Sequence, residues 1–279
     1  MIKKIVTYTL LTLLINPTLI PQTSLASTAA IVTSPFLYTF NGTGSLVEAG
    51  SMADTWSPYW WLNSGAYFKL SSGRGATNKG VLPLNDPWRL LYAVNNPQDT
   101  DNGLHPQNIF RLLTRSEWQD ARQEAYFVIK ANNLSKSSNR NASNGLLLFN
   151  RYQDSDNLYY TGVRVDGSAI VKKKVQGNYY TMAEIKNVYG GVYNHESQPN
   201  LLPLNKWIGI RSELTNENNG TVRIKLFIDK GWQGKWQQVA NVLDDGATYG
   251  GAAISITGFG GIRTDFMDVE FENYRLRSI

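Results

Sequence analysis

Short runs of alternating hydrophobic and polar residues follow one another along most of the chain. Examples are AYFVIKA (125–131), NLYYTGVRV (157–165), TVRIKLFID (221–229) and MDVEFENYRL (267–276). Turn sequences separate these runs at close spacing, among them DG at 166–167, NNG at 218–220 and DDG at 244–246. Alternation with a period of two predicts strands with one buried face, and such frequent turns are typical of antiparallel sheets. The pattern therefore predicts an all-β fold, a two-sheet antiparallel β-sandwich of the jelly-roll type.

Helical periodicity is scarce by comparison. The one short candidate is RSEWQDARQEA (115–125), which leads directly into a strand-like run. The region 71–108 is irregular, polar and rich in Gly, Asn and Pro, so we expect it to form loops. Long loops of this kind often carry functional side chains.

The first residues have the pattern of a secretory signal peptide. Lys3 and Lys4 precede an apolar run from Ile5 to Ile15, and the small-x-small sequence Ser24-Leu25-Ala26 follows. We expect a signal peptide over 1–26, cleaved near Ala26, and one extracellular domain over 27–279. An uncleaved N-terminal anchor is the alternative. The apolar run is shorter than the roughly 20 residues that span a bilayer, and no later run reaches that length, so no membrane span is expected.

Charge and cysteine content narrow the possible partners. The net charge of the 279 residues is +5 and is spread along the chain, which gives no case for a nucleic-acid partner. A weakly basic surface would tolerate an acidic polysaccharide. The chain has no cysteine, so it has no disulfide and no thiolate metal site. We expect a monomer whose fold rests on its hydrophobic core.

Three stretches resemble one family. They are GLLLFNRYQDSDNLYYTGVRVDGSAIVKKKVQGNYY (145–180), LPLNKWIGIRSELTNENNGTVRIKLFIDKG (202–231) and GGIRTDFMDVEFENYRL (260–276). Their order resembles that of concanavalin A-like lectin/glucanase domains, the laminin G-like jelly rolls. The resemblance implies a curved groove on a concave sheet, where sugar chains lie. It leaves activity open, because this fold hosts lectins, glycoside hydrolases, polysaccharide lyases and adhesion modules.

Candidate glycan-binding residues combine flat aromatic faces with arginines, which suit sugar rings and their hydroxyl or carboxylate groups. Those on neighbouring predicted strands are Arg111, Arg115, Tyr126, Arg151, Tyr160 and Arg164. A slip of one residue reverses the side on which each lies, so the sequence does not show which of them share a face. His105, in the polar loop GLHPQN, is a further candidate.

The aromatic run SPYWWLNSG (57–65) supplies one more candidate. Adjacent strand residues point to opposite faces, so Trp60 and Trp61 cannot both belong to one sugar platform. We expect Trp61 in the core and Trp60 as the sugar contact.

The resemblance also implies one structural Ca²⁺ where the first and last strands meet. Asn41, Glu48 and Asp268 are the residues that would supply oxygen ligands there, and an ordinary polar surface is the alternative.

No complete catalytic motif is present. Asp268, Glu270 and Glu272 alternate on one predicted strand face, which suits either paired catalytic carboxylates or an exposed surface. The sequence RSE occurs at 115–117 and 211–213 and is part of a motif in alginate-lyase-like jelly rolls, but its companion motifs are missing. The leading hypothesis is a secreted protein that binds an extracellular or cell-wall polysaccharide in a concave-sheet groove. The alternatives are a lyase or glycoside hydrolase on the same fold and an adhesion module.

Overall fold

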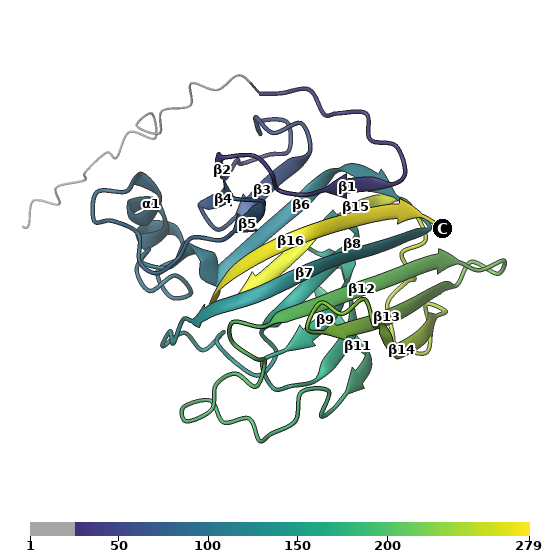
Figure 1. The fold of residues 1–279 in the computed structure, drawn as a ribbon. Coiled ribbons are helices and arrows are strands. Elements are labelled where there is room, and N and C mark those ends of the chain that lie inside the picture. Colours follow the sequence, from purple (N-terminus) through teal and green to yellow (C-terminus); the bar gives the residue numbers. More distant parts are fainter. Residues whose placement is uncertain (1–25) are drawn as a thin grey trace, which may run out of the picture.

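The computed structural model describes residues 26–279 and forms a sandwich of two antiparallel sheets (Figure 1). The predicted all-β fold class is therefore confirmed. The signal peptide predicted over 1–26 lies almost wholly outside the described residues. Within the described part of the chain, no helix is long and apolar enough to cross a membrane.

Sheet A has nine strands in the order β14-β13-β12-β7-β16-β5-β4-β2, with β1 paired to β16 beside β5. Its strands are β1 (Phe36–Tyr38), β2 (Gly44–Val47), β4 (Tyr67–Ser71), β5 (Arg74–Ala76), β7 (Ala121–Asn132), β12 (Trp207–Asn216), β13 (Val222–Lys230), β14 (Gln237–Asp244) and β16 (Met267–Ser278). Figure 1 shows β16, β7 and β12 running side by side across the front of the molecule, with strands of the second sheet behind them.

Sheet B has seven strands in the order β11-β10-β9-β8-β15-β6-β3. They are β3 (Trp60–Ser64), β6 (Ile109–Trp118), β8 (Gly145–Asp154), β9 (Asn157–Arg164), β10 (Ala169–Val175), β11 (Asn178–Ile185) and β15 (Gly258–Asp265). Strands that are distant in sequence thus become neighbours, since β15 lies between β8 and β6.

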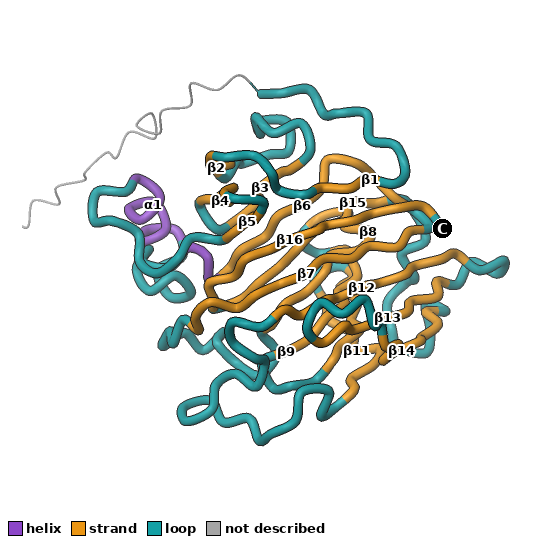
Figure 2. Tube along the Cα trace, in the orientation of Figure 1, coloured by secondary structure: helices purple, strands orange, loops and turns teal. Residues whose placement is uncertain are grey.

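The one helical candidate of the sequence does not form a helix. Residues 115–125 form the end of β6, a tight turn and the start of β7. The helix of the described chain, α1 (Pro87–Asn95), lies instead in the region expected to be loop, followed by the short 3₁₀ turn η2 (Pro106–Asn108). Asp86 caps α1 by accepting hydrogen bonds from the backbone N–H groups of Trp88 and Arg89. Figure 2 shows this helix at one end of the molecule, away from most of the strands.

The main core fills the space between the sheets. It is built from one face of each strand, for example Phe110 and Leu112 of β6 and Phe127 and Ile129 of β7. A second apolar cluster lies on the outer face of sheet B, where Leu113, Phe149, Leu158 and Tyr160 are almost completely buried. Because these side chains alternate with core residues along the same strands, both faces of sheet B carry packed apolar residues, and the outer cluster forms the base of the site described next.

Candidate functional site

A groove of about 450 Å³ lies on the outer face of sheet B. Its floor is formed by Leu147 of β8, Tyr160 of β9 and Ile170 of β10, all members of the outer apolar cluster. Its walls come from β6, β11 and β15, and its rim from asparagines of the segment 133–144. Six strands and a loop therefore converge on one hollow.

Four cationic side chains line the groove and two carboxylates oppose them. The cations are Arg111, Arg164, Lys172 and Arg263, and the carboxylates are Asp99 and Asp265. Each cation occupies the outward position of its strand, because its sequence neighbours on β6, β9, β10 and β15 face the core. The groove is therefore positively charged because alternation along each strand directs these four side chains outward.

Two of the cations are held by protein acceptors. Arg263 donates from Nε to Asp265 Oδ1 at 2.8 Å and from a terminal nitrogen to the Tyr160 hydroxyl at 3.2 Å. Arg164 donates to the carbonyl oxygen of Ala142 at 3.0 Å and lies 3.1 Å from Asp166. These contacts fix the guanidinium groups in place before any ligand binds.

The other two cations are free. Within residues 26–279, Arg111 and Lys172 have neither a hydrogen-bond acceptor nor an ion-pair partner. Burial, and then the nearby Arg164 guanidinium, lower the pKa of Lys172. The positive charges therefore oppose one another, and an anion in the groove would relieve that repulsion.

Two tyrosines form the aromatic wall of the groove. The rings of Tyr160 and Tyr179 lie 6.1 Å apart at 30°, and the Arg263 guanidinium lies 5.5 Å from the centre of the Tyr160 ring. Burial raises the pKa of Tyr160 to about 12. Burial also acts to raise the pKa of Tyr179, but the positive charges of Arg263 and Lys174 act against it, and the net shift is downward. The Tyr160 and Tyr179 hydroxyls thus share the field of the Arg263 guanidinium.

The rim is held by a network of side chains from two loops. Asp99 accepts hydrogen bonds from Ser137 at 2.5 Å and from Asn139 at 3.0 Å. Asp101 accepts from Ser135 at 2.6 Å. These contacts join the loop that precedes β6 to the loop that precedes β8, and they place Asn139 at the groove.

Three of the predicted glycan-binding residues, Arg111, Tyr160 and Arg164, line this groove. Tyr126 lies on the outer face of the other sheet, stacked on Trp232 at 4.3 Å. His105 lies outside the groove, with Nδ1 2.9 Å from Asp101 Oδ2.

Two of the predicted arginines have other tasks. Arg115 donates to the carbonyl oxygens of Ser27 and Ser57, both at 2.8 Å, and so ties the first described residues to sheet B. Arg151 was expected at the ligand surface, but its side chain is 1% exposed. Its guanidinium bonds to Gln119, Asp120, Asn216 and Ile254. That expectation is wrong, because a positive φ of 47° at a bulge in β8 turns the residue inward.

The assignment of the two tryptophans is also wrong. Trp60 is 1% exposed and packs in the main core against Tyr274, with ring centres 4.9 Å apart. Trp61 lies on the outer face of sheet B against the second apolar cluster, and its indole N–H donates to the carbonyl of Ala49. Period-two alternation separates the two rings as expected but leaves the choice of face open.

Sequence reasoning missed Lys172, Tyr179 and Arg263. The sequence VKKKV does contain a signal for Lys172, because Lys172 and Lys174 share the strand face opposite to Lys173. Nothing local points to Arg263, because β15 enters the groove by pairing with β8 and β6, far away in the sequence.

Two of the three residues expected to bind calcium, Glu48 and Asp268, have their carboxylates occupied by hydrogen-bond donors. Asp268 accepts hydrogen bonds from the N–H groups of Gly80, Gln107 and Asn133. Glu48 accepts from the Ala66 backbone and the Tyr92 hydroxyl, and burial raises its pKa. Donors rather than a cation thus surround both carboxylates, so these residues do not fit a calcium site. The described chain contains no cluster of three acidic, histidine or cysteine side chains suited to a metal.

No family model matches the sequence, and no curated protein matches it. Similar solved structures include the carbohydrate-binding module CBM66 from Bacillus subtilis, with 15% identity, a TM-score of 0.47, and coverage of 78% of this chain and 95% of that chain. The β-glucanase of Bacillus licheniformis has 8% identity and a TM-score of 0.46, with coverage of 90% and 100%. These similarities are too low to indicate the function of this chain. Of the architecture expected from the sequence, the structure shows the sandwich of two antiparallel sheets described above.

Proposed function

We propose that this chain is a secreted protein that binds an acidic polysaccharide in the groove of sheet B. The observation that carries the proposal is the pair of free cations, Arg111 and Lys172, beside the fixed guanidinium groups of Arg164 and Arg263. Guanidinium groups bind carboxylates and sulfates through paired N–H donors, and ammonium groups add charge without directionality.

The rest of the groove suits a sugar chain. Tyr160 and Tyr179 offer aromatic surface against which the apolar face of a sugar ring packs. Asn139, Asn141 and Asn144 at the rim offer amide donors and acceptors for hydroxyl groups. The volume of about 450 Å³ lies within the range of ligand sites.

Calorimetric titration with polygalacturonate, dextran sulfate and neutral dextran tests the proposal. Binding to at least one acidic polymer, and none to neutral dextran, is expected. The double variant Arg111→Gln/Lys172→Gln should weaken the groove's affinity about tenfold per lost contact. The matched control Lys69→Gln/Lys206→Gln removes the same charge from exposed positions outside the groove and should change affinity little. Equal losses in the two double variants would refute a specific site.

A second candidate function is a polysaccharide lyase centred on Tyr179. Its hydroxyl has a lowered pKa beside Arg263, in the same groove as the free cations. In that reaction the Tyr179 phenolate takes the proton next to a uronate carboxylate. The electron pair forms a carbon–carbon double bond and expels the linking oxygen, which takes a proton from water to become a hydroxyl, while the cations stabilise the negative charge on the uronate carboxylate.

The two functions separate in one assay. Incubation with polyuronates should produce the ultraviolet absorbance of an unsaturated sugar end only if the lyase operates. Tyr179→Phe should then abolish turnover while leaving affinity nearly unchanged. Hydrolysis has less support, because Asp265 is ion-paired to Arg263 and Asp99 holds Ser137 and Asn139.

A further inference from the structure

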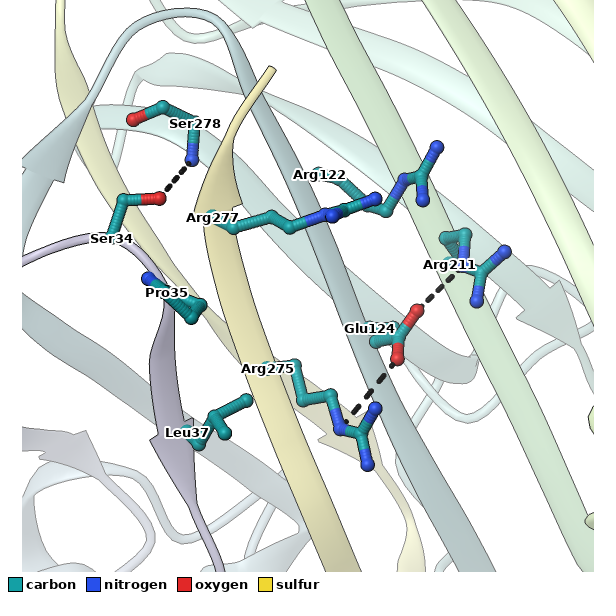
Figure 3. A pocket seen from close by; sticks show the side chains of 9 residues that line it. All are labelled: Ser34, Pro35, Leu37, Arg122, Glu124, Arg211, Arg275, Arg277 and Ser278. Atoms are coloured by element: carbon teal, nitrogen blue, oxygen red, sulfur yellow. Dashed lines mark hydrogen bonds and ion pairs between the residues drawn. The ribbon is translucent and has the colours of Figure 1, made fainter.

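A second cationic hollow lies on the opposite side of the sandwich, on the outer face of sheet A. Its volume is about 480 Å³, and it lies between three neighbouring strands and the segment 34–37 that enters β1. Four arginines line it against one carboxylate, Glu124, as Figure 3 shows: Arg122 of β7, Arg211 of β12, and Arg275 and Arg277 of β16.

Strand register arranges these side chains in two rows. In the first row, Arg211 and Arg275 are the cross-strand neighbours of Glu124 on its two sides. Arg211 Nε lies 2.6 Å from one carboxylate oxygen, whereas Arg275 Nε lies 3.9 Å from the other. Figure 3 shows Glu124 between the two guanidinium groups. One carboxylate thus serves two arginines, and Arg275 is only weakly engaged.

The second row leaves more positive charge unmatched. Arg122 has Glu213 as its neighbour on one side and Arg277 on the other. The pair Arg122–Glu213 is close, at 2.5 Å, but Arg277 has no ion-pair partner within residues 26–279. Like charges directly opposite each other on adjacent strands are destabilising, so an external anion beside Arg277 would stabilise this row.

A buried donor points the same way. The Nε of Arg122 is shielded from solvent and has no hydrogen-bond acceptor in the described chain. A buried donor without an acceptor costs about 1–3 kcal/mol. An oxyanion in the hollow would supply that acceptor once the Arg122 side chain turned toward it.

Aromatic side chains extend the hollow along the same face. The Arg211 guanidinium lies 4.0 Å from the centre of the Trp236 ring, and Trp236 lies beside Tyr126. Tyr126 in turn stacks on Trp232. An oxyanion site that continues into an aromatic surface suits a sugar ring with an acidic substituent.

We infer that this hollow is a second site for the oxyanion groups of an acidic polysaccharide, which makes the protein bivalent. The ligand class rests on the proposed function of the groove in sheet B, whereas the second site rests on its own arginines. The two sites face away from each other, so one molecule would hold two polymer chains and link them into a network.

The experiment uses the double variant Arg275→Gln/Arg277→Gln. Both side chains are exposed, so the thermal midpoint should stay close to that of the unsubstituted protein. Calorimetry with short dextran sulfate and polygalacturonate oligomers, at roughly 0.15 M salt, should give two binding sites for the unsubstituted protein and one for this variant. The control Lys69→Gln/Lys206→Gln should keep both sites. The two polymers distinguish sulfate from carboxylate recognition.

Turbidity with long polymers reports the links between chains. The unsubstituted protein and the lysine control should cross-link the acidic polymer. Both Arg275→Gln/Arg277→Gln and Arg111→Gln/Lys172→Gln should cross-link it much less, because each variant has lost or strongly weakened one of the two sites. If Arg275→Gln/Arg277→Gln still binds ligand at two sites, the second site is refuted. It is also refuted if the unsubstituted protein has one site and only the groove variant removes it. A third outcome is a single site that Arg275→Gln/Arg277→Gln removes and the groove variant leaves intact. The proposed function of the groove would then fail. The arginine site would stand alone, and bivalency would be refuted.

Discussion

Lys172, Lys173 and Lys174 are three identical residues in three different environments. Lys172 lines the groove, and Lys174 pairs with Asp156 at the surface. Lys173 is completely buried, with Nζ 2.7 Å from the equally buried Asp244, which also accepts from the Tyr159 hydroxyl. Alternation along β10 separates Lys173 from the other two, because only Lys173 points between the sheets.

The substitution Lys173→Met should lower the free energy of unfolding by about 3–5 kcal/mol, because it leaves Asp244 buried without its cation. Lys174→Met removes the same charge from the next residue and should cost about 1 kcal/mol or less. Urea unfolding of both variants measures the difference. Similar losses in the two variants would show that Lys173 is not the buried partner of Asp244.

The two tryptophans give a second test at the residue scale. Trp60→Ala should destabilise the protein by about 3–5 kcal/mol, because the ring packs in the core between the sheets. Trp61→Ala should cost less, because that ring is partly exposed on the outer face of sheet B. Thermal unfolding monitored by circular dichroism would rank them, and the reverse order would contradict the described face assignment.

The strands were predictable from the sequence, but the way they combine into the groove was not. Alternating runs mark β7, β9, β13 and β16, since local packing on one face determines their composition. The groove depends on pairing between distant strands and on bulges, such as the irregularity between Asn150 and Asp154 that turns Arg151 inward. Those features reverse the direction of a side chain without leaving a trace in the alternation.

Two glycines allow β8 and β9 to approach closely beneath the groove. A Cβ atom at Gly162 would lie 2.1 Å from the carbonyl oxygen of Leu146, and one at Gly145 would lie 2.0 Å from that of Val163. Gly162 also lies between Tyr160 and Arg164 on the groove face.

Gly162→Ala should therefore displace β9 and weaken polymer binding at the groove, with a loss of roughly 1–3 kcal/mol in stability. Gly50→Ala is the matched control, because a Cβ atom there has open space around it and φ is ordinary. Binding and urea unfolding of both variants should be compared. Unchanged binding in the folded Gly162→Ala protein would show that this close approach does not position the groove.

At the scale of the whole molecule, buried tyrosines should control stability at high pH. Burial raises the pKa of Tyr92, Tyr126, Tyr159 and Tyr274 above 10.0 in the folded protein. Above pH 10 the unfolded chain releases these protons while the folded chain retains them, so the unfolded state is favoured as pH rises.

Each such tyrosine should remove about 1.4 kcal/mol of stability per pH unit above 10, until the pH reaches its folded-state pKa. Urea unfolding between about pH 8 and pH 11 measures the slope. Tyr159→Phe should reduce the slope, although it also removes the hydrogen bond to Asp244. A flat profile would mean that these hydroxyl groups ionise as readily in the folded protein as in the unfolded chain.

Calcium gives a further test at this scale. The donors around Glu48 and Asp268 leave no oxygen cage, so a chelator should not shift the thermal midpoint. A bound ion stabilises a folded protein by mass action, and its removal would lower the midpoint. A clear drop on chelation would show that the sequence-based expectation of a structural ion was sound and that its ligands lie elsewhere.

The position of β16 determines when the sandwich can close. This strand pairs with β7 on one side and with β5 and β1 on the other, and its Tyr274 and Phe271 fill the core. Figure 1 shows β16 in yellow beside β1 in purple, so strands from the two ends of the described chain lie together. While the chain is being synthesised, β1 and β5 have no partner at this seam until residues 267–278 emerge. The seam of sheet A between β1, β5 and β7 therefore forms late, because its central strand is the last of the described strands to become available for pairing.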